Sequence, residues 1–351
     1  MIPYLRNSKP WFVFLVHLRG IYDADRVGVG RFLRAYSQSD SEFASKLETL
    51  PAVVSSEVRF RSTAIYGEVI CINRLPESMI GPEARHDVLS AAQLGISRGA
   101  KVIGLGALTA PATGGGLAIV RHLPSNVTVT NGNALTAAMV HSNTVSASRH
   151  LCGTDAGKVT VAVVGCTGSV GNALTFLLAR DGYQLILIGR NQQRVEREFT
   201  AIPKAVCSGD ISDIRKADIV VLLTSDPTAL ITPELPREGS IIIDCAQPAN
   251  IPHDSYVEFG NRGISVVEGG MVRIPEYSST DDFGFSCRTD TFACLAETYL
   301  FARSGIREHS VGRCQAEPAL RMKSLAQRFG VHPRPLDFSL PAGRLAASHA
   351  S

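Results

Sequence analysis

Residues 158–194, KVTVAVVGCTGSVGNALTFLLARDGYQLILIGRNQQR, constrain the fold of this chain more than any other stretch. The apolar, β-branched run 159–164 is typical of a buried parallel strand. A turn with three glycines follows, after which 172–180 has the composition of a helix and 185–188 that of a second strand. This order of strand, glycine turn, helix and strand predicts the βαβ unit of a Rossmann-type, doubly wound parallel sheet.

The turn itself points to a ligand. Glycine lets a backbone turn tightly and come close to a pyrophosphate, and the start of the following helix offers free N–H groups and the positive end of a dipole. The spacing here is G-x-x-G-x-x-G, a variant of the dinucleotide-binding pattern. The alternative is a tight turn that binds nothing. The residues that we expect to hold a dinucleotide are Gly165, Thr167, Gly168, Ser169, Val170 and Gly171.

The residues after the second strand indicate which nicotinamide cofactor binds. An Asp or Glu at this place would accept a hydrogen bond from a ribose 2′-hydroxyl, whereas this chain has Arg190 and Asn191, with Arg194 close behind. Cationic groups suit a 2′-phosphate, so these three residues favour NADPH over NADH.

Three more apolar runs, 217–223, 240–244 and 264–267, predict the remaining strands of this sheet. In an open α/β sheet, ligands bind at the carboxyl ends of the strands. The first of these runs leads into Thr224 and Ser225, which we therefore expect to contribute to the cofactor site.

The N-terminal part of the chain has strand and helix patterns of its own. Residues 11–18 (WFVFLVHL), 67–72, 101–105 and 127–130 predict strands, and 82–98 predicts an amphipathic helix that ends at a glycine. The fold class is therefore α/β, with a Rossmann-type doubly wound parallel sheet in the C-terminal half and a second α/β domain before it.

We expect the chain to divide into three parts. Residues 1–155 would form an N-terminal α/β substrate domain, 156–275 the Rossmann domain, and 276–351 a helical C-terminal segment that packs back and ends in a frayed tail. Within the first part, the glycine-rich stretch 106–116 predicts a loop that faces a ligand or moves.

A second strand-to-helix junction lies at residues 131–133, Asn-Gly-Asn. Such a helix start can hold a phosphate or polarise a carbonyl. Equally, Asn131 or Asn133 can simply cap the helix that follows, to roughly residue 149. The residues alone leave both interpretations open.

A second stretch with residues that could take part in a reaction is 285–301, FSCRTDTFACLAETYLF. Asp290 or Thr291 can cap a helix whose first turn contains Cys294, and Glu297 follows about one turn later. The start of a helix lowers the pKa of a thiol because the dipole and the free N–H groups favour the thiolate. A cysteine in such an apolar context is nevertheless more often a small core residue than a nucleophile.

Composition excludes several function classes. Hydrophobic residues make up 45% of the 351 and charged residues 19%, as in ordinary globular proteins, and a net charge of +3 is too small to indicate nucleic-acid binding. No apolar run approaches the roughly 20 residues that cross a bilayer. The eight cysteines are scattered without C-x-x-C pairs, which indicates neither a metal site nor a disulfide framework and favours a reducing cytoplasm.

Over most of its length the chain resembles the long-chain acyl-[acyl-carrier-protein] reductases, typified by the cyanobacterial enzymes that make fatty aldehydes. The resemblance is divergent. The segments that carry it are FVFLVHL, TNGNALTAAMV, VAVVGCTGSVGNAL with LIGRNQQR, SIIIDCAQPANI, VVEGGMV and above all FACLAET. The family's acylated cysteine falls on Cys294, so the resemblance favours a nucleophile at this position over a core residue.

The resemblance also implies a mechanism. The thiolate of Cys294 would attack a fatty acyl thioester of an acyl carrier protein or of coenzyme A, and NADPH would reduce the acyl-enzyme to a free aldehyde. Donors to the oxyanion would come from the helix start at Cys294 or from the turn at residues 131–133. Cys294, Glu297 and Asn133 thus form the expected catalytic set. The acidic carrier protein would be the partner, with an aldehyde-using enzyme possible downstream.

Two other functions fit parts of the pattern. A dehydrogenase of the shikimate-dehydrogenase type also uses a glycine turn of this kind, but it needs a Lys–Asp pair, and Lys101 is the obvious strand-borne lysine without a well-placed Asp after it. A nucleotide-sensing protein without catalytic activity would keep the glycine turn and lose the catalytic residues. His17 and Tyr299 are the remaining candidates for a proton donor, although a buried histidine and a packed tyrosine are common in cores.

Overall fold

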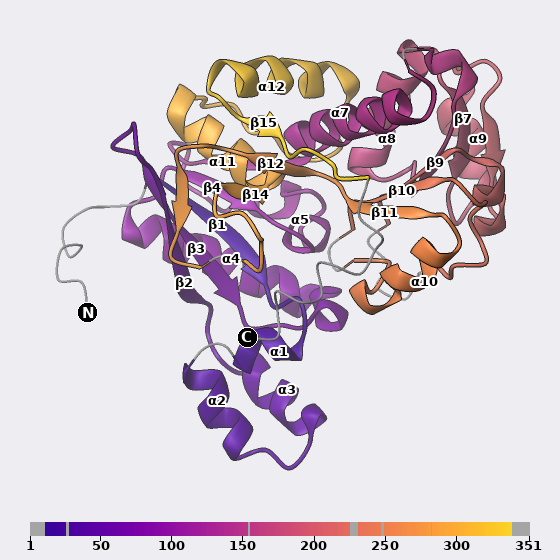
Figure 1. Ribbon diagram of the computed structural model, residues 1–351. Helices are drawn as coiled ribbons and strands as arrows, with labels where there is room; N and C mark the ends of the chain where they lie inside the picture. The colour runs from indigo at the N-terminus through magenta and orange to yellow at the C-terminus, as the bar shows by residue number, and fades with distance from the viewer. Residues whose placement is uncertain are drawn as a thin grey trace. The chain divides into compact units, whose positions relative to one another are not determined.

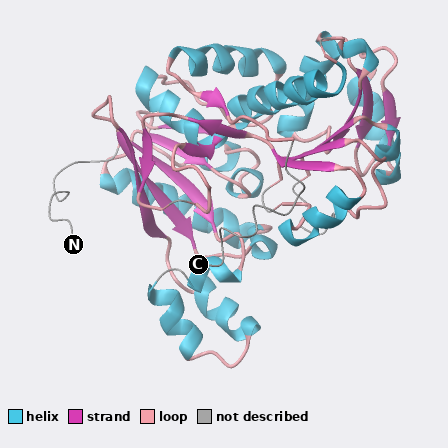
Figure 2. Cartoon of the chain, viewed as in Figure 1, coloured by secondary structure: helices cyan, strands magenta, loops and turns pink. Residues whose placement is uncertain are grey.

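The computed structural model describes residues 11–25, 28–153, 155–224, 231–246, 249–281 and 283–338. It divides the chain into two compact units, each made of two stretches of sequence (Figures 1 and 2). Unit 1 is Met1–Gly132 with Ile274–Gly312, and unit 2 is Asn133–Arg273 with Arg313–Ser351.

Unit 1 is built on a six-stranded sheet in the order β13-β2-β3-β1-β4-β5. The strands from β3 to β5 are parallel, while β2 runs antiparallel to β3 and β13 antiparallel to β2. Nearly all residues of the parallel strands are buried, as the apolar runs predict. The strands are β1 Phe12–His17, β2 Val53–Phe60, β3 Tyr66–Ile72, β4 Val102–Leu105, β5 Thr128–Thr130 and β13 Tyr277–Ser279.

Helices pack on this sheet or extend from it. The predicted helix at 82–98 is confirmed as α4, which ends at Gly99 in the left-handed conformation. Its residues Ala91 and Ala92 share a core with Val13 and Leu15 of β1. The other helices of unit 1 are α1 Ile21–Asp25, α2 Gly28–Ala35, α3 Asp40–Glu48, α5 Thr109–Ala112, α6 Leu117–Val120 and α11 Ala293–Ser304, which follows the short strand β14 Asp290–Phe292.

Unit 2 has a Rossmann-type sheet in the order β11-β10-β9-β6-β7-β8, with every neighbouring pair parallel. Counted from β6, this is the order 3-2-1-4-5-6 of dinucleotide-binding sheets. All five strand regions that the sequence predicts in this part are confirmed. The strands are β6 Thr160–Val164, β7 Gln184–Ile188, β8 Val206–Ser208, β9 Ile219–Leu222, β10 Ile241–Asp244 and β11 Ser265–Glu268.

The helices of unit 2 bury one side of this sheet in a shared core. Val140 and Ala147 of α7 lie in one apolar cluster with Leu174 of α8 and Val161 of β6. A two-stranded pair, β12 Met271–Arg273 with β15 His332–Pro333, completes the unit. Its helices are α7 Asn133–Cys152, α8 Ser169–Arg180, α9 Gln192–Phe199, α10 Tyr256–Asn261 and α12 Ala316–Arg328.

The boundaries between the units differ from the expected 1–155, 156–275 and 276–351. The helix α7 belongs to unit 2 because its apolar side packs in the core of the Rossmann sheet. The C-terminal segment is divided between the units, since α11 packs against β4 in unit 1 and α12 against α7 in unit 2. Sequence patterns show that a helix has an apolar face, but they do not show which sheet it covers.

The stretch 106–116 is more ordered than the loop that the glycines predict. It contains α5, and its three consecutive glycines adopt left-handed conformations before α6 begins. Gly115 is held by backbone contact with Gly312, whose N–H donates to the Gly115 carbonyl over 2.8 Å. These glycines therefore serve close packing in unit 1.

We expect Gly104→Ala to destabilise the protein by about 1–3 kcal/mol, the usual cost of overpacking a core. A Cβ atom at Gly104 in β4 would lie 2.0 Å from Thr298 Oγ1 of α11, so the helix would have to move. Urea unfolding measures the change. Gly157→Ala is the matched control, because its Cβ would have 3.4 Å to the nearest atom, and it should change stability by less than about 0.5 kcal/mol. Equal midpoints for the two variants would contradict this account of how α11 is seated.

Candidate active site

Cys294 lies at the start of α11, in unit 1. It is the second residue of the helix, whose N-cap is Phe292, in place of the expected Asp290 or Thr291, and no side chain caps the helix. The backbone N–H groups of Cys294, Leu295 and Ala107 lower the pKa of the thiol, so they favour its anion. Ala107 follows β4 and has a φ of 46°, a left-handed conformation that is uncommon for a residue with a side chain. Backbone from the start of α11 and from the segment after β4 thus favours negative charge on the sulfur.

The environment of Cys294 nevertheless keeps the thiol protonated. Burial raises the pKa of Cys294 to about 12 and outweighs the backbone N–H groups, while the charge of Glu297 raises it further. The expectation that the helix start lowers this pKa is therefore wrong for the protein as it stands. The local dipole acts in the expected direction, but the loss of solvent around the sulfur is the larger effect.

The turn at residues 131–133 meets Cys294 through its glycine. Gly132 has a φ of 70°, and a Cβ atom there would lie 2.2 Å from the Cβ of Cys294. The side-chain nitrogen of Asn131 donates to the carbonyls of Gly115 and Gly312 over 3.1 and 2.9 Å. Asn131 therefore holds the packed glycine stretch, and Gly132 lets the backbone touch the base of the cysteine.

Glu297 is completely buried three residues after Cys294. Its Oε1 accepts a hydrogen bond from Thr130 Oγ1 over 2.5 Å, and Thr130 Oγ1 in turn accepts one from the Gly132 N–H over 3.1 Å. This chain of bonds joins the helix that carries Cys294 to the turn that touches it. A buried carboxylate needs such partners, so the contact is a strong local constraint.

His17 supports the same site from the end of β1. Its Nε2 accepts a hydrogen bond from the Leu108 N–H over 3.2 Å, and its Nδ1 donates to the Leu18 carbonyl over 2.7 Å. Burial lowers the pKa of His17, which fits a neutral ring with both nitrogens engaged. His17 thereby fixes the segment that carries Ala107. Tyr299, the other candidate proton donor, stacks on Phe60 with ring centroids 3.5 Å apart.

In unit 2, the glycine turn is packed closely on its own backbone. A Cβ atom at Gly171 would lie 2.3 Å from the Gly165 carbonyl oxygen, and Gly165 has a φ of 86°. Gly168 is exposed and is the N-cap of α8, a helix of 12 residues. The turn therefore offers bare backbone and helix N–H groups at the carboxyl end of β6, where a pyrophosphate fits.

Two expected site residues meet at this turn. Asn133 Nδ2 and the Cys314 N–H each donate to Ser169 Oγ over 2.9 Å. Asn133 therefore fixes the first residue of α8, while its expected catalytic role stays a prediction. Thr224 lies beside Gly165, because its backbone nitrogen is 3.1 Å from the position that a Cβ atom added to Gly165 would take. Ser225 lies outside the described residues.

The polar residues after β7 form a cluster around a carboxylate. Asn191 caps α9, its Oδ1 accepting from the Arg194 N–H over 2.9 Å. Arg194 Nε donates to Glu198 Oε1 over 2.8 Å, and Arg313 donates to Glu198 Oε2 and, over 3.0 Å, to the Thr167 carbonyl. Arg190 is exposed next to them. Sequence reasoning missed Arg313, which is 146 residues from Thr167. Glu198 could have been found from the sequence, because residues four apart on a helix, such as Arg194 and Glu198, lie side by side.

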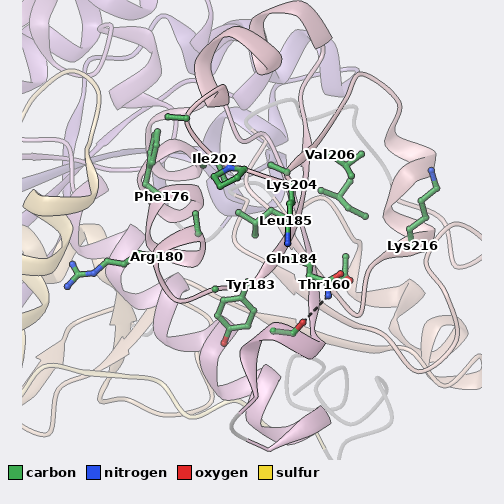
Figure 3. A pocket seen from close by; sticks show the side chains of 17 residues that line it. Thr160, Phe176, Arg180, Tyr183, Gln184, Leu185, Ile202, Lys204, Val206 and Lys216 are labelled. Carbon is green, nitrogen blue, oxygen red and sulfur yellow. Dashed lines mark hydrogen bonds between the residues drawn. The ribbon is translucent and has the colours of Figure 1, made fainter.

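Unit 2 also has a cavity away from the turn. It has a volume of about 910 Å³ and lies at the amino ends of β6, β7 and β8, whereas the glycine turn follows the carboxyl end of β6 (Figure 3). A dinucleotide on the turn would not occupy it. Its lining includes Thr160, Phe176, Arg180, Tyr183, Gln184, Leu185, Ile202, Lys204, Val206 and Lys216.

Two kinds of feature are absent from the described part of the chain. No group of three or more His, Cys, Asp or Glu side chains is placed to hold a metal ion there. Among the same residues, no helix has the length and apolarity that a membrane span requires.

The chain is thus an α/β protein with one mixed sheet and one parallel sheet, and the parallel one is a Rossmann sheet with a glycine turn. No family model matches it. It is 27% identical over 259 residues to the aminotransferase PigE of Serratia sp., covering 71% of this chain and 30% of that protein. It is 30% identical over 186 residues to the long-chain acyl-[acyl-carrier-protein] reductase of Synechococcus elongatus, covering 50% of this chain and 52% of the reductase. The chain therefore spans about a third and about half of these relatives.

Solved structures with a similar fold include two dehydrogenases. L-tryptophan dehydrogenase from Nostoc punctiforme aligns with a TM-score of 0.48 and 14% identity, over 97% of this chain and 88% of that one. Shikimate dehydrogenase from Aquifex aeolicus aligns with a TM-score of 0.43 and 11% identity, over 90% of this chain and 98% of that one.

We expect alkylation of Cys294 by iodoacetamide to accelerate with every step from pH 7 to pH 10.5. The reactive thiolate grows about tenfold per pH unit below the thiol pKa, which is about 12 here. Peptide mass spectrometry measures the modification, and the exposed Cys152 monitors the reagent in the same sample. A rate that levels off near pH 7 would contradict the protonated resting thiol.

We expect Thr130→Val to lower the free energy of unfolding by about 1–3 kcal/mol, because it leaves the buried Glu297 carboxylate without one of its donors. Thr130→Ser keeps the hydroxyl and is the control. Denaturant unfolding compares the two variants. A valine variant as stable as the serine variant would mean that the hydroxyl is dispensable.

Proposed function

We propose that this chain reduces a fatty acyl thioester, carried by an acyl carrier protein or by coenzyme A, to a free aldehyde, with Cys294 as the nucleophile and NADPH as the reductant. The observation that carries the proposal is the position of Cys294 at the start of α11, among three backbone N–H groups and against Gly132. The name of the similar Synechococcus protein and the resemblance of FACLAET to its family support the same activity.

The surroundings of the sulfur suit acyl transfer. The sulfur of Cys294 bonds to the thioester carbonyl carbon, and the carrier sulfur leaves that carbon. The proton of the Cys294 thiol is lost in this exchange and the carrier thiolate gains one, so that the charge balances. The N–H groups of Ala107, Cys294 and Leu295 favour negative charge at this point, where charge develops during the attack.

The raised pKa of Cys294 sets a condition on this step. A thiol that is neutral at rest must lose its proton as the S–C bond forms, so the reaction is coupled to proton transfer. Glu297 acts as a positioning residue in this scheme, because its bond to Thr130 ties α11 to the turn at Gly132. His17 positions the Ala107 segment in the same way.

The glycine turn of unit 2 is the cofactor site of the proposal. Backbone at Gly165 and Gly171, where a Cβ atom would collide, and the start of α8 would hold the pyrophosphate. Arg190, Asn191 and Arg194 would face the 2′-phosphate. Bound there, NADPH would supply a hydride to the acyl carbon, and the bond from this carbon to the Cys294 sulfur would break to give the aldehyde and the free thiolate.

The shikimate-dehydrogenase alternative finds less support. Lys101 is exposed at the amino end of β4, and its N–H donates to the Trp11 carbonyl over 3.0 Å. The carboxyl ends of β1, β4 and β5, where the Cys294 site is built, lie at the other end of these strands. A sensor without chemistry would have no need of the donors around Cys294.

Intact-mass analysis after incubation with palmitoyl-CoA, or with palmitoyl-acyl carrier protein, tests the proposal. Without NADPH, the protein should gain the mass of one acyl group, and adding NADPH should remove it and release aldehyde. Cys294→Ser should lose aldehyde formation and the hydroxylamine-sensitive thioester adduct, whereas Cys152→Ser, which changes an exposed thiol, should keep both. A wild-type protein that gains no acyl group from either carrier, or an active serine variant, would refute covalent catalysis.

A further inference from the structure

Arg313 joins the glycine turn from a distant part of the chain. Within unit 2, its Nη2 donates to the Thr167 carbonyl over 3.0 Å, and Arg194 Nη2 approaches the same carbonyl at 3.5 Å. Thr167 lies between Gly165 and Gly168 of the turn. Two guanidinium groups therefore converge on the backbone at the place where the adenosine half of a dinucleotide passes from the pyrophosphate to the end of β7.

Glu198 holds both guanidinium groups at this place. Each of its two carboxylate oxygens accepts one hydrogen bond, Oε1 from Arg194 Nε and Oε2 from Arg313 Nη2. Burial alone would raise the pKa of Glu198, but the hydrogen bonds from Arg313 and Arg194 outweigh it and keep this pKa below its usual range. Glu198 is thus a carboxylate whose oxygens are already engaged by guanidinium groups, so it is poorly suited to bind a ribose 2′-hydroxyl.

The cluster retains positive charge and free donors. Arg194 and Arg313 share the single carboxylate of Glu198, which leaves about one positive charge after pairing. Arg313 uses Nη2 for both of its bonds, so its Nε and Nη1 have no partner among the described residues. Its side chain is 41% exposed. A guanidinium with two unused N–H edges and solvent access is suited to bind a phosphate.

We propose that Arg313 is a specificity residue for the 2′-phosphate of the cofactor, acting beside Arg194, with Glu198 as the group that orients both. The assignment rests on the proposed function only for the presence of a nicotinamide dinucleotide on the glycine turn. Arg313 begins the second stretch of unit 2, and it adds a determinant of cofactor specificity to the residues that follow β7. The ligand feature that it recognises is the phosphate that distinguishes NADPH from NADH.

Binding measurements test this without any acyl substrate. The dissociation constants of NADPH and NADH are measured by nicotinamide fluorescence for the wild type, Arg313→Ala and Arg313→Lys. Adenosine 2′,5′-bisphosphate and AMP serve as competitors that lack the nicotinamide. We expect Arg313→Ala to weaken NADPH and the bisphosphate about tenfold, as for one lost charge-assisted contact, and to change NADH and AMP less than about twofold. Arg313→Lys should be intermediate.

Two further variants separate recognition from a structural role. Arg197→Ala removes an exposed charge from the same helix α9 and should leave both affinities unchanged. Glu198→Gln weakens the hold that orients both guanidinium groups and should therefore reduce the preference for NADPH.

An equal loss of NADPH and NADH in Arg313→Ala would overturn the proposal, because it would show that the residue only supports Thr167. An unchanged NADPH affinity would overturn it as well. Binding of neither nucleotide by the wild type would remove the cofactor from the proposed function and this assignment with it. Normal nucleotide binding without acyl transfer would instead defeat the proposed function and leave Arg313 in its role.

Discussion

The contact of Gly132 with Cys294 determines how the candidate site is built. A Cβ atom at Gly132 would lie 2.2 Å from that of Cys294, and one at Gly104 would lie 2.0 Å from Thr298 Oγ1, one turn further along α11. Thr298 Oγ1 also donates to the Cys294 carbonyl over 2.9 Å. Two glycines at the carboxyl ends of neighbouring parallel strands therefore set how deeply α11 is seated. The sulfur lies where it does because backbone, rather than side chains, faces the helix.

The same close packing explains the state of the thiol. Removing water from around Cys294 raises its pKa more than three backbone N–H groups lower it. Such donors gain in strength when negative charge appears in a site without water, because no solvent competes for them. A thiol that is neutral at rest is also a poor target for oxidation, which requires thiolate character.

Local patterns in the sequence predicted many of the helices and strands, but they did not predict the contacts between residues far apart in the chain. The βαβ unit, its glycine turn and the helix α4 follow from periodicity and from turn residues that act within a few positions. The assignment of α7 to the Rossmann unit, the pairing of Thr130 with Glu297, and the contact of Arg313 with Thr167 join residues far apart in the chain. No spacing encodes such pairs. The predicted direction of the Cys294 pKa shift was wrong for a related reason. Desolvation depends on everything that packs around the sulfur.

The segment from Ser310 to Cys314 connects the two turns through the covalent chain. In unit 1, the Ser310 carbonyl accepts from the Asn131 N–H over 2.9 Å, and the Gly312 carbonyl accepts from the Asn131 side chain. In unit 2, the next two residues hold the other turn, Arg313 at Thr167 and Cys314 at Ser169. Five consecutive residues thus fix a glycine turn in each unit. These contacts belong to one short stretch of backbone that leads from unit 1 into unit 2.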